Sequence, residues 1–371
     1  MVAAGRERKV AATPLHWRRL PLLALGMAAL LAALAGGLAR LHWRVPGVTG
    51  SWITYHGALM VGGFLGTVIG LERAVAVGRR PAYLVPALAA AGGLSLLAGF
   101  PRLPGAALLA LAAAGLVILY ATLLARQWTP HTATMALGAA CWLVGNLLWL
   151  VGWEVPEVVP WWLAFLILTI AGERLELSRF RPPGRLGERL FVAATTLFLA
   201  GVALTAVRPD GGWRLLGVGE VALAAWLGRY DIARHTVRRP GLPRFVAICL
   251  LSGYVWLALG GGFAVAVGGP PGGDLPYDLL LHPVFLGFVM SMIFGHAPII
   301  FPAILGRPLP FHRRFYLHLA LLHASLVARI VGDLTGVVPL RGWGGLLNVV
   351  AILLFLLSTA SAVVAGEGPR R

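Results

Sequence analysis

The chain has 371 residues, of which 58% are hydrophobic and only 12% are charged. This composition excludes a soluble globular domain and is typical of a polytopic helical membrane protein. The apolar runs are continuous rather than alternating, which favours helices over a membrane β-barrel. The net charge of +17 resides mostly on arginines in short loops between apolar runs, so we expect no nucleic-acid binding.

Twelve apolar segments predict an all-α protein with one transmembrane domain over residues 1–371. Each segment is about long enough for a hydrocarbon core roughly 30 Å thick. Tails are expected at 1–19 and 366–371. The expected spans are 20–39, 52–76, 82–100, 104–125, 132–152, 158–176, 190–207, 213–229, 244–267, 278–304, 315–336 and 343–365.

Basic and acidic residues alternate between successive loops. Arginines concentrate in the N-terminal tail, in the loops 78–81, 177–189, 229–244 and 307–314, and at the C-terminus. The alternate loops 153–157 and 272–278 are acidic, although Arg40 and Arg44 in the first outer loop depart from the pattern. The bias toward basic cytoplasmic loops predicts both termini in the cytoplasm, and we expect a prokaryotic inner membrane as the location.

Two histidines lie at matching positions in their spans. His56 is near the start of the second span and His282 near the start of the tenth, and both spans run inward in the predicted topology. The two imidazoles therefore share a depth, as the two axial ligands of one heme must. Gly63, Gly66 and Gly70 follow His56 at helical spacing, and such small residues let a ring or a helix approach closely. A purely structural role remains open, in which the glycines pack helices and the histidines bind backbone carbonyls.

The segment 54–60, Thr-Tyr-His-Gly-Ala-Leu-Met, resembles the second-helix His-Gly-x-x-Met motif of catalytic subunits in the heme–copper oxidase and nitric oxide reductase superfamily. The run from His282 to His296, followed by Gly306-Arg-Pro-Leu, is similar to the NnrS branch, whose members are linked to nitric oxide tolerance. The resemblance implies an oxidase-like bundle, with one b-type heme held by His56 and His282. It also implies electron transfer in nitric oxide or respiratory stress metabolism.

The chain departs from an oxygen reductase in its histidines. The sixth and seventh spans contain no histidine for a copper ion, and no second histidine adjoins His282. A proton-pumping oxidase is therefore not expected, and whether the chain is an enzyme stays open.

Further polar residues lie within the expected spans. His296, with His323 or His318 of the eleventh span, could hold copper or a second heme, although we expect His318 to face lipid head groups. Arg329 and Asp333 are one turn apart, a spacing that supports an ion pair, and Arg329 also suits a heme propionate.

Acidic residues mark the other end of the spans. Glu72 and Glu173 each precede an arginine, and Glu220 lies within the eighth span. They form either a structural ion-pair network or a proton path. Asp231 is expected in a solvated loop.

Two other functional classes remain open. One is a twelve-helix secondary transporter, which the prolines and glycines of the ninth and tenth spans would fit. The other is a non-catalytic membrane subunit of a respiratory complex. Expected partners are the lipid bilayer, heme and nitric oxide, with either respiratory-complex or homo-oligomeric contacts.

Overall fold

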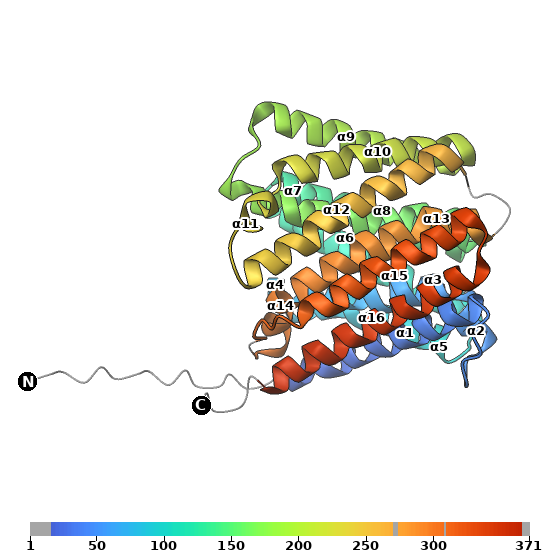
Figure 1. Ribbon diagram of the computed structural model, residues 1–371. Helices are drawn as coiled ribbons and strands as arrows, with labels where there is room; N and C mark the ends of the chain where they lie inside the picture. The colour runs from blue at the N-terminus through green and yellow to red at the C-terminus, as the bar shows by residue number, and fades with distance from the viewer. Residues whose placement is uncertain (1–15, 270–273, 308, 366–371) are drawn as a thin grey trace, which may run out of the picture.

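The computed structural model describes residues 16–269, 274–307 and 309–365, and all regular secondary structure in these ranges is helical. The helices pack side by side into one bundle (Figure 1). The start of α1 (Leu20–Arg40) lies at the end of α14 (Ser291–Leu305), where the His16 amide donates to the Leu305 carbonyl over 3.1 Å. Most of the expected tails, 1–15 and 366–371, lies outside the described residues.

The helices of the first half are α2 (Gly50–Thr54), α3 (His56–Ala58), α4 (Thr67–Val77), α5 (Leu84–Leu97), α6 (Arg102–Arg126), α7 (Pro130–Leu150) and α8 (Val155–Leu177). Those of the second half are α9 (Gly184–Thr205), α10 (Pro209–Tyr230), α11 (Ala233–Thr236), α12 (Leu242–Val267), α13 (Asp274–His282), α15 (Phe315–Thr335) and α16 (Val338–Ala365). Short 3-10 turns begin α1 and α5 and follow α8.

Eleven helices of the described chain are long and apolar enough to cross a membrane. The prediction of an all-helical, polytopic membrane protein is therefore confirmed, as is the division between α5 and α6. The expected eighth span is the helix α10, which is not among these eleven because of its more polar composition. It nevertheless packs directly on α9, since a Cβ atom at Gly219 would lie 2.4 Å from Phe198 Cα.

The two histidine-bearing helices share a local deformation. α3 continues into the π-helical segment η2 (Leu59–Gly66), and α13 continues into the π-helical segment η5 (Pro283–Met290). π-Helical turns are rare and occur frequently at functional sites. Each segment begins directly after, or one turn after, its histidine.

The glycines that follow His56 serve helix packing. A Cβ atom at Gly63 would lie 2.9 Å from Ala29 Cβ, and one at Gly66 would lie 2.6 Å from the Trp142 ring. Gly70 has the same close approach to Val85. These glycines therefore let α1, α5 and α7 pack against η2 and α4, and none of the three lines the cavity described below.

Candidate functional site

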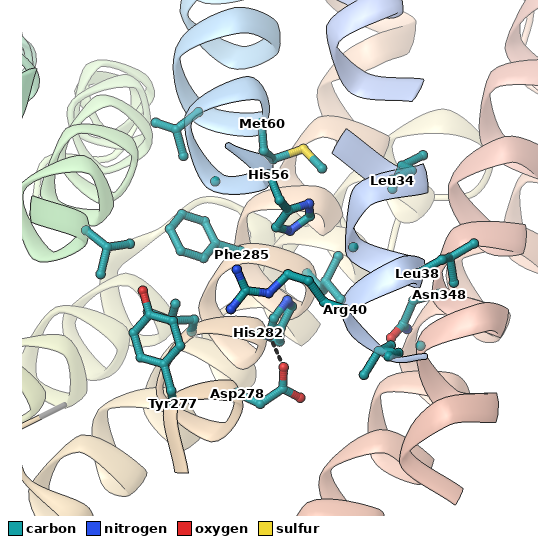
Figure 2. A pocket seen from close by; sticks show the side chains of 18 of the residues that line it. Leu34, Leu38, Arg40, His56, Met60, Tyr277, Asp278, His282, Phe285 and Asn348 are labelled. Atoms are coloured by element: carbon teal, nitrogen blue, oxygen red, sulfur yellow. Dashed lines mark ion pairs between the residues drawn. The ribbon is translucent and has the colours of Figure 1, made fainter. Parts of the chain in front are cut away.

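His56 and His282 line one cavity between α1, α3, α8, α13, α15 and α16. The empty space between its walls is about 1420 Å³, including its open mouth. Figure 2 shows both imidazoles extending into this space from their separate helices, with the Arg40 guanidinium and the Phe285 ring beside them. The walls are mainly apolar, including Leu34, Leu38, Val61, Leu65, Trp162, Leu286 and Val289.

The ring of His56 is oriented by α1. Its Nδ1 lies 2.6 Å from the Ala33 carbonyl oxygen, so Nδ1 carries the proton and donates, because the carbonyl can only accept. The lone pair is then on Nε2. Gly37 leaves space for the ring, since a Cβ atom there would lie 2.9 Å from His56 Cε1. This tautomer, with a fixed Nδ1–H and an Nε2 lone pair, is the one that metal-ligating histidines use.

The ring of His282 lies beside a carboxylate. Its Nδ1 is 2.7 Å from Oδ1 of Asp278, one helical turn earlier (Figure 2). Arg329 holds the same carboxylate with two hydrogen bonds, Nε to Oδ2 at 2.7 Å and Nη2 to Oδ1 at 2.6 Å. Nη2 of Arg329 also lies 3.4 Å from His282 Nε2, a long and weak contact. A ligand at Nε2 would have to displace only this contact.

Three arginines contribute to the lining of the cavity. Arg40, Arg329 and Arg341 all line it, together with the single carboxylate Asp278. Arg341 pairs with Asp333, with Nε 2.9 Å from Oδ1. The expected ion pair between Arg329 and Asp333 is wrong, because the side chain of Arg329 reaches α13 instead of following its own helix. The cationic rim formed by Arg40, Arg329 and Arg341 suits an anionic group on a bound molecule.

The other histidines named from the sequence do not join this cavity. His323 accepts from Trp256 Nε1 at Nδ1 over 2.8 Å, and its Nε2 lies 3.0 Å from Ser252 Oγ. His296 binds the Met292 carbonyl of its own helix through Nδ1. No group of three or more His, Cys, Asp or Glu residues in the described chain is placed to hold a metal ion. A second metal or heme site at His296 and His323 stays a prediction.

His318 was expected to face lipid head groups, and this is wrong. Its side chain is buried, and neither ring nitrogen has a hydrogen-bond partner. The rings of Phe245, Phe294, Phe315 and Phe355 surround it. Its position on the inward face of α15 explains the error, because the ring there contacts phenylalanines of α12, α14 and α16.

The acidic residues at the opposite end of the helices form ion pairs. Arg73 Nη2 lies 3.0 Å from Glu72 Oε1 and also binds Glu173. Glu220 is separate from this group: it is buried in α10, and its Oε1 has no hydrogen-bond partner. The structure thus joins two of the three carboxylates named for a proton path, and that path stays a prediction.

Asp231 is buried rather than solvated, which corrects the sequence-based expectation. Arg174 donates to both of its carboxylate oxygens, over 2.6 and 2.9 Å, and the Tyr254 hydroxyl donates to Oδ2 over 2.7 Å. The charge is tolerated there because three neighbouring groups satisfy it, including the Ala233 amide.

Sequence reasoning missed Asp278, Arg40 and Arg341 as members of the cavity. Asp278 was assigned to an acidic loop, yet it lies four residues before His282 and therefore on the same helical face. That spacing was the available signal. Arg40 was named only as an exception to the charge bias of the loops.

Comparison with known proteins gives a family but no activity. No curated protein matches the chain, and no solved structure matches it. The family described as a domain of unknown function (DUF8744) matches residues 19–364. The match covers nearly the whole chain, including every residue of the cavity, and the protein therefore belongs to the DUF8744 family.

Proposed function

We propose that this protein binds one b-type heme in the cavity, with His56 and His282 as the two axial ligands. The observation that carries the proposal is the pair of imidazoles that line one apolar cavity from two separate helices. Heme bound in this way supplies one-electron chemistry, and a site with both axial positions filled suits electron transfer rather than binding of a gas to the iron.

The residues around the imidazoles fit such a ligand. His56 presents an Nε2 lone pair because Nδ1 is bound to Ala33, and His282 has the Asp278 carboxylate at its Nδ1. Outer partners of this kind orient metal-ligating histidines. The apolar walls suit a porphyrin face, and the cationic rim suits its propionates. Arg40 lines the cavity without an ion pair to Asp278, while Arg329 and Arg341 already pair with Asp278 and Asp333.

The wider role rests on the resemblance to the NnrS branch. We propose a multi-pass protein of a prokaryotic inner membrane, with α10 as a twelfth span and both termini in the cytoplasm. Its electron transfer would serve nitric oxide or respiratory stress metabolism.

The reduced-minus-oxidised absorption spectrum of the purified protein tests heme binding. We expect a low-spin b-type signal in the wild type that is lost in both His56→Ala and His282→Ala. His323→Ala is the matched control, because it removes an intramembrane histidine outside the cavity, and it should keep the signal. A colourless protein from heme-replete cells would contradict the proposal, as would retention of the unchanged signal in His56→Ala and His282→Ala.

A secondary transporter is the second candidate. The cavity has an open mouth with a cationic rim, and both helices that carry its histidines are interrupted by π-helical segments, which resembles the broken helices of transporters. An organic anion would be the expected substrate. Uptake of such an anion into vesicles by heme-free protein, abolished by Arg329→Gln, would favour this candidate over the heme protein.

A further inference from the structure

The two imidazoles of the cavity differ in what lies at Nδ1. His56 donates to the Ala33 carbonyl, a neutral group, over 2.6 Å. His282 lies 2.7 Å from the carboxylate of Asp278. The negative charge of a carboxylate beside the ring makes an imidazole a stronger electron donor to a metal than a neutral carbonyl does. The two proposed ligands are therefore chemically unequal.

Asp278 is held firmly in place. It is buried, and Arg329 binds both of its oxygens at 2.6 and 2.7 Å. Oδ1 of Asp278 lies close to both His282 Nδ1 and Arg329 Nη2. The imidazole and the guanidinium therefore compete for the same oxygen. Arg341 is farther away, with Nε 3.9 Å from Oδ2. The charge of Asp278 is thus divided chiefly between one imidazole and one guanidinium.

We propose that Asp278 is a positioning residue that sets how strongly His282 donates to the heme iron, and that Arg329 moderates this effect through the same carboxylate. The inference rests on the proposed heme site and adds to it a mechanism for setting the reduction potential. A stronger donor favours ferric over ferrous iron, so Asp278 lowers the potential and Arg329 limits that lowering.

The two residues have opposite expected effects. Asp278→Asn removes the anion beside His282, so we expect the midpoint potential to rise. Arg329→Gln leaves Asp278 free to act on His282 and removes a cation near the iron, so we expect the potential to fall. If Arg329 acts through Asp278, its removal should lower the potential less in the Asp278→Asn background than in the wild type.

Redox titration of the purified holoprotein tests this scheme with four chains: wild type, Asp278→Asn, Arg329→Gln and the double variant. Arg40→Gln is the matched control, because Arg40 also lines the cavity but forms no ion pair with Asp278. Arg40→Gln should change the midpoint potential by the same amount in the wild type and in the Asp278→Asn background. Asp278→Glu, which keeps the charge, should restore a potential closer to that of the wild type.

The outcomes separate this inference from the heme proposal. A heme-loaded wild type whose potential does not rise in Asp278→Asn would overturn the inference alone, and so would equal Arg329→Gln shifts in both backgrounds. If Asp278→Asn retains no heme, a larger downward shift in Arg329→Gln than in Arg40→Gln supports the inference, and an equal shift overturns it. A wild type without heme would overturn both.

Discussion

Both ends of the bundle hold polar side chains within the helices, but their surroundings differ. At the end where α3 and α13 begin, His56, His282 and the cationic rim face an open cavity. At the opposite end, where α4 and α8 finish, Arg73 and Arg174 are enclosed by the carboxylates of Glu72, Glu173 and Asp231. A polar side chain within the membrane therefore indicates a binding site only where it lines a cavity.

The histidines repeat this contrast. The His323 ring is bound on both sides, by Trp256 and Ser252, and has no lone pair directed at a cavity. The His56 ring is bound on one side only, and its other nitrogen faces the cavity. Four substitutions test this difference between the two ends of the bundle.

The largest effect is expected from Gly37→Ala. The added methyl group would lie 2.9 Å from His56 Cε1, so the ring would have to leave its position beside Ala33. We expect loss of most of the bound heme, measured as heme per protein after purification. Gly262→Ala is the control, because nothing lies within 4 Å of its Cβ position. Full heme content in Gly37→Ala would show that the orientation of His56 does not matter.

A large effect on stability, without an effect on heme, is expected from Arg174→Gln. The change leaves the buried carboxylate of Asp231 without its main partner, and breaking such a pair costs about 3–5 kcal/mol. Thermal unfolding in detergent should show the loss, while the absorption spectrum of folded protein stays unchanged. A spectral change in Arg174→Gln would mean that the two ends of the bundle are coupled.

A smaller loss is expected from His323→Ala. It leaves the Trp256 Nε1–H without an acceptor, which costs about 1–3 kcal/mol for a buried donor. The same unfolding measurement applies, and heme content should remain at the wild-type level. Loss of heme here would return His323 to the set of candidate ligands.

The smallest effect is expected from Arg214→Gln. Its carboxylate partner Asp210 lies 3.1 Å away, Arg214 Nη1 also donates to the Val265 carbonyl over 2.6 Å, and both side chains are largely exposed. Exposed ion pairs contribute at most about 1 kcal/mol. An effect as large as that of Arg174→Gln would contradict the distinction between buried and exposed pairs on which the comparison depends.

The sequence predicts the helices and the two central histidines but not the contacts between distant segments. Continuous apolar runs determine where helices form, and the matched depth of His56 and His282 follows from counting residues within them. Pairs such as Arg329 with Asp278, or Arg174 with Asp231, join residues more than fifty positions apart. These pairs depend on which helices become neighbours, and lipid-facing and helix-facing apolar surfaces have nearly the same composition.

Local spacing was also misleading where a tertiary partner competes with it. Arg329 and Asp333 have the spacing of a helical ion pair, yet each binds a residue of another helix, Asp278 and Arg341 respectively. The burial of His318 among four phenylalanines likewise follows from helix packing, since each of these rings is unremarkable in a membrane segment.

Heme ligation by both His56 and His282 can be tested directly with the low-temperature electron paramagnetic resonance spectrum of the oxidised, purified protein. Two imidazole ligands on one iron predict a low-spin ferric signal, and either His56→Ala or His282→Ala should convert it to a high-spin signal or abolish it. A wild type with only high-spin ferric heme, or with no heme, would contradict ligation by this pair of histidines.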